Sequence, residues 1–440
     1  MDLRTNMEQN RPSVSEGLNK ARSVKAEAEI WTPQMLEALV NGVKGGKWFS
    51  LIDKVCRPST LLRAWRKVYS NKGSAGVDRQ SVEAFSHRAD TYLKELSDSL
   101  AQGHYRPAAV KRVDIPKGKG QTRPLGIPTV KDRIVQTATL MVIEPIFEAM
   151  FLDVSYGFRP GRGAMDALAE VERLLEQGYT YVVDADLQAF FDSIPHAGLM
   201  ARVEESISDG RLLELLQMWL NQDIMAEGRC WKPTGGTPQG AVISPLLANI
   251  YLHYLDKEMT DNGFKMVRYA DDFVVMCKSE GEAKAAMFKV MAWVKDNNLC
   301  LSPEKTQMGN CLEIGQGFEF LGYHYERGYK FVRRKSLARM RERLRELTPR
   351  NSGQSLGMVI ERLNRTLKGW YGYFKYAVTD TFKKLDMFVR RRLRAMLLKQ
   401  NKRNGFGLSL STHKRWPNSF FADKGLFTML QARLEAIQSR

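Results

Sequence analysis

Three aspartates have the residue type and the setting to bind divalent cations. Asp271 and Asp272 are adjacent within the apolar stretch Val267 to Val275, and Asp186 ends an apolar stretch that begins at Thr180. Aspartate disfavours strands, and burying a carboxylate without a partner costs several kcal/mol. A solvated hairpin tip is the simpler interpretation of the adjacent pair, because aspartate is common in turns. The second acidic strand end, at Asp186, favours a shared site instead.

Two predicted elements must bring these carboxylates together. Residues 180–186 are typical of a strand, and residues 266–269 and 273–277 predict a hairpin with the adjacent aspartates at its tip. Carboxylates about 4 Å apart repel by roughly 4 kcal/mol at an effective dielectric constant of about 20, and divalent cations would relieve that repulsion. Two Mg²⁺ ions held by oxygen ligands could then promote an in-line phosphoryl displacement. Asp184 lies on the same strand face as Asp186, so spacing alone does not choose between them.

A basic hairpin tip is the second feature that could do chemistry. Lys117 to Arg123 is flanked by the strand-like runs 110–115 and 125–127, which predicts a hairpin whose tip projects into solvent. The loop-like segment Thr234 to Gly240 opens a predicted helix through residues 246–255. Further helices are predicted at residues 32–43, 61–69, 196–208, 212–220 and 280–296, and two short strands at 318–325 and 330–332. Residues 1 to about 30 lack apolar periodicity, and we expect them to be mobile.

The excess positive charge is concentrated in one segment, predicted to be helical to about residue 401. Residues 327–403 hold 23 Lys and Arg against 5 Asp and Glu, which accounts for the whole net charge of +18. Aromatic residues are interleaved with these cations, at Trp370, Tyr371, Tyr373, Phe374, Tyr376 and Phe388. A basic run could be a solvated helical face, but this mixture suits a surface that pairs with phosphates and stacks or packs rings. We therefore predict a nucleic-acid partner.

The composition argues against several other classes of protein. At 440 residues the chain is long enough for two or three domains. It contains no run of 18 apolar residues and no apolar secretory centre, so we expect a cytoplasmic protein with no membrane partner. The cysteines are scattered and form no Cys-x-x-Cys pair, so neither a disulfide framework nor a structural zinc site is expected. They are Cys56, Cys230, Cys277, Cys300 and Cys311.

Specific motifs follow one another along the chain. The most specific is Y-A-D-D at residues 269–272, within its apolar hairpin. The others are N-K-G-S-A-G-V-D (71–78), I-P-K-G-K-G-Q-T-R-P-L-G-I-P-T-V-K-D-R-I-V-Q (115–136), S-Y-G-F-R-P-G-R (155–162), D-A-D-L-Q-A-F-F-D-S-I (184–194), G-G-T-P-Q-G (235–240), S-P-L-L-A-N-I-Y-L (244–252), F-L-G-Y (320–323) and L-N-R-T-L-K-G-W-Y-G-Y-F (363–374). In type and order they resemble the landmarks of bacterial group II intron-encoded reverse transcriptases, over roughly residues 45 to 435.

The resemblance implies an α+β fold with right-hand polymerase architecture and an RNA-directed DNA polymerase activity. The expected domains are an N-terminal extension (1–65, partly disordered and then helical), fingers (66–165), a palm of antiparallel sheet and helices with the aspartates (166–326), a basic helical thumb or maturase domain (327–403) and a C-terminal tail (404–440). The expected substrates are dNTPs and an RNA template with a DNA or RNA primer, used with two Mg²⁺ ions. Group II intron RNA is the further expected partner.

The resemblance also assigns roles to single residues of the polymerase site. Asp186 and Asp271 become the principal metal ligands and Asp272 a weaker third, and Phe191 becomes the steric gate against a 2′-hydroxyl. The residues matched to dNTP binding, besides Phe191, are Lys117, Arg123 and Gln239. Simpler interpretations remain for each: a core aromatic for Phe191, an ordinary basic tip for the two cations and a helix-capping loop for Gln239.

Phosphate contacts are assigned by the same resemblance to the basic segment. The residues are Arg365, Lys368, Arg390, Arg391 and Arg392. Two departures from the family pattern are visible: Gln188 stands where many relatives carry a charged residue, and no endonuclease pattern follows Arg403, as in the compact subclass. Two alternative functions stay open, a maturase that acts mainly as an RNA-folding cofactor and a domesticated relative used in DNA repair or defence.

Overall fold

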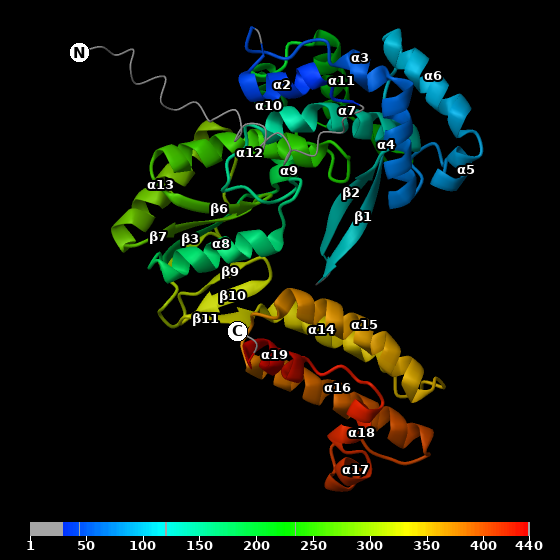
Figure 1. Ribbon diagram of the computed structural model, residues 1–440, viewed down its shortest axis with the longest axis vertical. Coiled ribbons are helices and arrows are strands. Elements are labelled where there is room, and N and C mark those ends of the chain that lie inside the picture. The colour runs from blue at the N-terminus through cyan, green and yellow to red at the C-terminus, as the bar shows by residue number, and fades with distance from the viewer. Residues whose placement is uncertain (1–29, 44, 119–120, 234, 439–440) are drawn as a thin grey trace. The chain divides into compact units, whose positions relative to one another are not determined.

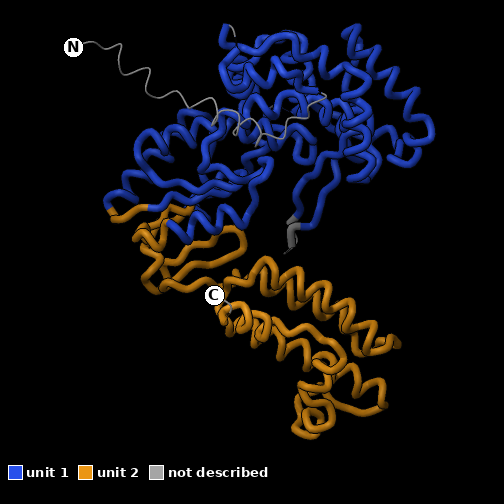
Figure 2. The backbone as a smooth tube through the Cα atoms, in the orientation of Figure 1, with its two compact units in different colours: residues 1–173, 185–276, 281–306 blue, residues 174–184, 277–280, 307–440 orange. Residues whose placement is uncertain are grey.

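The structure, a computed structural model, describes residues 30–438 except 44, 119–120 and 234. The segment expected to be mobile, residues 1 to about 30, lies almost entirely outside the described residues. Contacts divide the chain into two compact units (Figure 2). The first unit comprises residues 1–173, 185–276 and 281–306, and the second comprises residues 174–184, 277–280 and 307–440.

Helices form the N-terminal part of the first unit (Figure 1). They are α2 (Pro33–Asn41), α3 (Ile52–Cys56), α4 (Pro58–Asn71), α5 (Val82–Ser86), α6 (Ala89–Ala101) and α7 (Val130–Glu148). The predicted start of α2 is confirmed, because Thr32 Oγ1 accepts a hydrogen bond from the Met35 amide at 3.3 Å. Helix α7 packs against α4 and is buried around most of its circumference, with Ile134, Val135 and Val142 all in the core.

The predicted basic hairpin is confirmed as β1 (Val110–Gly118) and β2 (Gln121–Ile127), which pair antiparallel. Figure 1 shows this hairpin extending away from α7 as a two-stranded arm. At its base β1 pairs parallel with β4 (Ile224–Ala226), which continues into β5 (Arg229–Trp231). The sheet order is β2-β1-β4-β5.

A second four-stranded sheet carries the aspartates. Its order is β6-β7-β3-β8, from strands β6 (Lys265–Tyr269), β7 (Asp272–Cys277), β3 (Tyr181–Asp186) and β8 (Gln307–Asn310). The pairs β6·β7 and β3·β8 are antiparallel. Helices of this part of the chain are α8 (Ala164–Glu176), α9 (Phe190–Ser193), α10 (His196–Glu204), α11 (Gly210–Leu220), α12 (Ser244–Asp261) and α13 (Glu280–Asp296). An antiparallel sheet with helices around it fits the predicted α+β class.

The second unit joins a small sheet to helices. Strands β9 (Phe318–Phe320), β10 (Tyr323–Glu326) and β11 (Tyr329–Val332) form a sheet in the order β11-β10-β9. The basic segment is helical as predicted, in α14 (Arg334–Leu347), α15 (Leu356–Phe374) and α16 (Thr379–Gln400). The tail forms three further helices, α17 (Leu410–Arg415), α18 (Asn418–Asp423) and α19 (Met429–Gln438). Helix α19 is tied to α16, because the Asp386 carboxylate accepts from the Met429 and Leu430 amides.

The prediction of one strand over residues 318–325 is wrong. The chain turns at Leu321 and Gly322, whose φ angles of 47° and 85° are both left-handed. Phe320 and Tyr323 then face each other across the β9·β10 ladder. A two-residue hairpin turn of type I′ has positive φ at both central positions, and the F-L-G-Y motif supplies a glycine at the second. Separately, no helix among the described residues is long and apolar enough to span a membrane.

Candidate active site

The predicted hairpin with acidic residues is confirmed, with one difference at its tip. Tyr269 pairs with Asp272 across the β6·β7 ladder, so the turn consists of Ala270 and Asp271 alone. Ala270 has a φ of 61°, a left-handed conformation that is uncommon for a residue with a side chain. Asp271 therefore lies at the tip and Asp272 begins β7, and both residues are half-buried.

A buried arginine holds this strained turn. Arg268 in β6 is 0% exposed, and its Nε and Nη2 donate to the two Asp256 carboxylate oxygens at 2.7 and 2.5 Å. Its Nη1 also donates to Asn249 Oδ1 at 2.9 Å and to the Ala270 carbonyl at 2.8 Å. Each nitrogen of the buried guanidinium therefore has a hydrogen-bond acceptor, and one of these acceptors, the Ala270 carbonyl, belongs to the turn.

The same network holds the S-Y-G-F-R-P-G-R motif (residues 155–162) against the hairpin. Asn249 Nδ2 donates to the Gly157 carbonyl at 2.8 Å, and a Cβ added at Gly157 would lie 2.2 Å from the Ala270 nitrogen. Only glycine fits so close an approach of two backbones. Gly157 and Asn249 belong to two different sequence motifs, so two distant segments of the chain meet at the Y-A-D-D hairpin.

The sequence reasoning missed the Arg268 network, although a signal for it exists. Arg268 is a charged residue within the apolar strand Met266–Tyr269, and a buried charge requires a partner. Its partner Asp256 is fully buried in α12. The sequence could have indicated the need for a partner, but not which of the many carboxylates supplies it.

Asp186 ends β3 and lies beside a lysine that the sequence reasoning also missed. Lys305 Nζ is 2.6 Å from Asp186 Oδ2, and Asp186 keeps 40% of its side chain exposed. The Ser302 amide donates to the Asp186 carbonyl at 2.8 Å, which places the segment with Lys305 alongside the strand end. Asp184 is buried and accepts from Gln307 Nε2 at 3.3 Å. The buried Asp184 carboxylate therefore accepts a hydrogen bond from a neutral side chain. The partly exposed Asp186 carboxylate instead lies beside the Lys305 ammonium.

Strand β3, which ends at Asp186, is the neighbour of β7 in the sheet, so the strand end lies beside the hairpin tip with Asp271. Burial raises the pKa of Asp271, and the neighbouring Asp186 carboxylate raises it further, while its own backbone hydrogen bond, Lys305 and Arg268 oppose the increase in pKa. Carboxylates that disfavour each other's ionisation are stabilised by a nearby cation. The predicted meeting of the strand end and the hairpin tip is therefore observed in the structure.

The helix that carries Phe191 contacts the loop that carries Gln239. Phe191 is half-buried in α9, edge-on to Phe190 with ring centroids 5.6 Å apart. Its carbonyl accepts from the Thr237 amide at 2.6 Å, and Gln239 Nε2 lies 3.3 Å from Asp192 Oδ2. The predicted loop at residues 234–240 is thus bound to α9.

This loop also reaches the base of the basic hairpin. The Gly126 amide donates to the Gln239 carbonyl at 2.6 Å, and a Cβ added at Gly240 would lie 2.5 Å from the Gly126 carbonyl oxygen. Arg123 faces Ile115 across the ladder and is exposed. The side chain of Lys117 lies outside the described residues. The loop that carries Gln239 is therefore hydrogen-bonded to α9, which carries Phe191, and to β2, which carries Arg123.

The donor set at the tip fits magnesium better than a softer metal. Among the described residues, no cluster of three or more His, Cys, Asp or Glu could hold an ion by itself. Mg²⁺ commonly takes one or two carboxylates, with water and substrate phosphates completing its coordination. Asp186 and Asp271 supply two such oxygen ligands, and the Lys305 ammonium already occupies a cation position 2.6 Å from one of them. The residues present therefore fit the predicted ion.

The predicted phosphate contacts differ in their surroundings. Arg365 and Lys368 are exposed on α15, and Arg390 and Arg391 are half-buried on α16. Arg392 is used within the protein, because its Nε donates to Thr348 Oγ1 at 3.1 Å and its Nη2 to the Thr348 carbonyl. Burial lowers the pKa of Arg392, and the neighbouring arginines Arg391, Arg345 and Arg350 lower it further. These contacts give Arg392 a structural role at the end of α14.

The interleaved aromatic residues mainly pack inside the second unit. Tyr373 Oη donates to the Leu321 carbonyl at 2.8 Å, and Tyr323 Oη donates to the Tyr373 carbonyl at 2.7 Å. Phe374 is buried, 4.6 Å from Trp370 between ring centroids. These rings join the end of α15 to the β9–β11 sheet. Of the two roles that the sequence allowed them, packing is the one observed.

Comparison with known proteins gives two family matches. The model for reverse transcriptase (RNA-dependent DNA polymerase) matches residues 115–325, and the model for the group II intron maturase-specific domain matches residues 337–416. The first match spans the basic hairpin and the aspartates, and the second spans most of the basic helices.

Two curated relatives and one solved structure are similar to parts of this chain. Protein YkfC of Escherichia coli (strain K12) is 35% identical over 314 residues, which is 62% of this chain and 82% of that protein. The group II intron-encoded protein LtrA of Lactococcus lactis subsp. cremoris is 38% identical over 204 residues, covering 46% of this chain and 33% of that protein. A solved partial Cas6-RT-Cas1–Cas2 complex matches 56% of this chain and 41% of that one, with 27% identity and a TM-score of 0.37.

Proposed function

We propose that this chain, which belongs to the family of group II intron-encoded reverse transcriptases and maturases, extends a primer on an RNA template at the site around Asp186 and Asp271. Membership of the family makes it an RNA-directed DNA polymerase with a maturase region. Single residues of this chain would carry out the catalysis and bind the substrates, as follows.

One observation carries the assignment of the site. Asp186 and Asp271 come from separate elements, yet β3 and the β6·β7 hairpin are neighbours in one sheet, and the Asp186 carboxylate raises the pKa of Asp271. The Asp271 turn is held by the Arg268 bond to the Ala270 carbonyl, so its position is fixed before any substrate binds. Asp186, Asp271 and the weaker third ligand Asp272 would hold two Mg²⁺ ions, which supply a Lewis acid for the attacking and leaving oxygens.

The remaining polymerase residues would bind and select the dNTP. Arg123 and Lys117 on the hairpin would grip the triphosphate, since an arginine can bind two oxygens in its planar fork. Gln239 would lie along the sugar of the incoming nucleotide, and its bonds to Asp192 and Gly126 support that orientation. Phe191, anchored through its carbonyl to Thr237, would exclude a 2′-hydroxyl.

The basic helices would bind RNA through phosphate contacts. Arg365, Lys368, Arg390 and Arg391 are the proposed contacts, and Arg392 would support them by fixing α14 against α16. Contacts to phosphates set register without reading sequence, so this surface would serve both the template–primer and group II intron RNA. Its role in splicing follows from the maturase region, and the identity of the intron RNA is a further expectation.

Replacing Asp271 with Asn tests the site. Primer extension on an RNA template with Mg²⁺ should fall at least about 100-fold, because a lost ligand removes charge stabilisation worth several kcal/mol. Binding of the template–primer should stay within a few fold. Asp261→Asn is the matched control, since Asp261 is exposed at the end of α12. Near-normal extension by Asp271→Asn would refute the assignment.

A further inference from the structure

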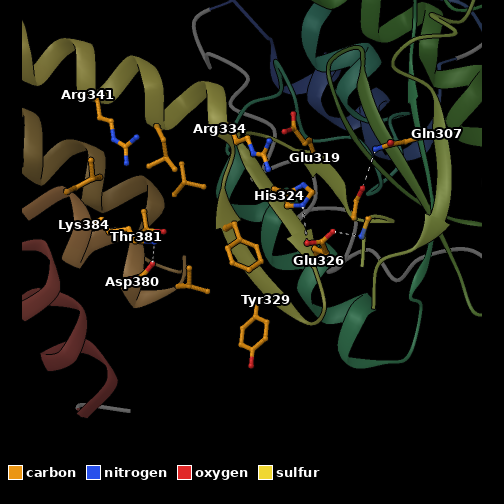
Figure 3. Close-up of a pocket in the computed structure, with 17 residues that line it drawn as sticks. Gln307, Glu319, His324, Glu326, Tyr329, Arg334, Arg341, Asp380, Thr381 and Lys384 are labelled. Atoms are coloured by element: carbon orange, nitrogen blue, oxygen red, sulfur yellow. Dashed lines mark hydrogen bonds and ion pairs between the residues drawn. The ribbon is translucent and has the colours of Figure 1, made fainter. Parts of the chain in front are cut away.

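The second unit contains a groove of about 950 Å³ that the polymerase site does not use. It is bounded by β10 and β11 and by the first turns of α14 and α16 (Figure 3). Its described lining includes none of the residues assigned above to the aspartate site or to phosphate contacts. A volume of this size accommodates a nucleotide or a drug-sized molecule.

A row of rings forms one wall of the groove. Strand alternation directs Tyr323 and Tyr325 into the core, so His324 lies on the opposite face of β10. His324 faces Phe331 across the ladder, and their ring centroids are 6.3 Å apart. Tyr329 follows at 6.2 Å from Phe331, with 58% of the residue exposed. These rings lie side by side on two adjacent strands, a spacing that lets successive bases stack.

Cations from two helices also line the groove. Arg334 and Arg341 are two turns apart on α14, and Lys384 extends from α16 with Asp380 at 2.6 Å. Figure 3 shows the Arg334 guanidinium beside His324, with Arg341 and Lys384 farther along the groove.

Carboxylates also line the groove, and they are held by partners. Glu326 accepts from the Gly315 amide at 2.7 Å and lies 4.0 Å from His324 Nε2. Glu319 lies 3.5 Å from Arg333 Nη1. The groove therefore offers rings, donors and acceptors together, with cations and carboxylates in near balance. A surface that follows a duplex backbone would be strongly positive instead, whereas the edge of an unpaired base presents both donors and acceptors.

We propose that this groove binds an unpaired stretch of RNA, with bases stacked on Tyr329, Phe331 and His324 and a phosphate beside Arg341 and Lys384. The proposal goes beyond the polymerase site and the phosphate-binding helices, because it assigns recognition of bases rather than of backbone to the second unit. It requires single-stranded RNA, since paired bases cannot reach rings on a protein wall.

The test compares single-stranded with double-stranded RNA on the full chain. A fluorescein-labelled RNA strand of about 10 nucleotides and its blunt duplex would be titrated by anisotropy. Tyr329→Ala should weaken binding of the strand about ten-fold, because stacking is lost, and should change binding of the duplex less than about two-fold. Tyr329→Phe keeps the ring and should retain the affinity of the unsubstituted protein. Arg341→Ala should weaken binding of the strand by about three- to ten-fold.

Matched controls separate the groove from the general surface. Phe288→Ala removes a ring that is 72% exposed on α13, and Lys383→Ala removes an exposed cation next to Lys384 on α16. Neither should change the difference between strand and duplex. Photo-crosslinking of 5-iodouracil RNA to the unsubstituted protein gives a second readout, independent of any variant, and should label Tyr329 or Phe331. Equal loss of strand and duplex binding in Tyr329→Ala, or crosslinks that map only to other elements, would overturn the proposal.

Discussion

Arg268 and Arg365 are the same residue type in opposite settings. Arg268 in β6 is 0% exposed and is bound by Asp256, Asn249 and the Ala270 carbonyl. Arg365 in α15 has 74% of its side chain exposed and lies 3.6 Å from Glu361, one turn earlier. Burial makes the first charge dependent on its specific partners, whereas water and salt screen the second. The hairpin with Asp271 therefore depends on a few buried contacts, whereas the exposed Arg365 makes a contact that is individually weak.

Replacing Arg268 with Met should have the largest effect. The substitution leaves Asp256 buried without its counter-charge, and removing one partner of a buried pair costs about 3–5 kcal/mol of unfolding free energy. It also releases the Ala270 turn, so primer extension should fall at least about 100-fold through misplacement of Asp271. Denaturant unfolding and single-turnover extension measure the two losses.

Two further variants make this comparison quantitative. Arg365→Met, the same change on an exposed helix, should alter the unfolding free energy by less than about 0.5 kcal/mol. Arg268→Lys keeps the charge but loses the planar fork, so its stability should lie between those of the unsubstituted protein and Arg268→Met. Equal unfolding free energies for Arg268→Met and Arg365→Met would show that the contrast between the two regions is mistaken.

Phe191→Ala tests whether the active site also selects by shape, without any change of charge. Removing the ring should raise incorporation of ribonucleotides relative to deoxyribonucleotides by about 10- to 100-fold, since steric selection of this kind is worth a few kcal/mol. The measurement is the ratio of rNTP to dNTP incorporation at matched concentrations. Phe288→Ala, on the exposed face of α13, serves as the control ring. A lower stability with an unchanged ratio would identify Phe191 as a core aromatic only.

The smallest effect is expected from exposed cations of the basic helices. Arg365→Ala combined with Lys368→Ala should flatten the plot of log affinity against log salt by about 0.7 per lost contact on single-stranded RNA. Affinity at one fixed salt concentration should change only modestly, and unfolding should be unaffected. Arg392→Ala should instead lower the unfolding free energy by about 1–3 kcal/mol, because its bonds to Thr348 are lost. An unchanged salt slope in the variant with Arg365→Ala and Lys368→Ala would show that RNA does not contact this face of α15.

Several features of the protein followed from local sequence. The helix predicted at residues 280–296 is found there, and both predicted hairpins form, because alternation of apolar residues and turn chemistry act over a few neighbouring residues. The α+β polymerase class, the reverse transcriptase and the maturase region are confirmed by the family matches. The domain boundaries, the absence of an endonuclease region and the individual dNTP and phosphate contacts stay predictions.

Other features depended on residues far apart in the chain. The sequence placed Asp271 at a hairpin tip, but only the folded chain supplies Asp256, Asn249 and Gly157 to hold that tip in place. It gave Arg392 the same role as Arg365, whereas tertiary packing directs Arg392 to the carbonyls of α14. Local patterns determine which segments become helices, strands and turns, since those depend on neighbouring residues. Which buried charge meets which partner depends on how those segments pack, because desolvation and hydrogen bonding act only between groups brought into contact.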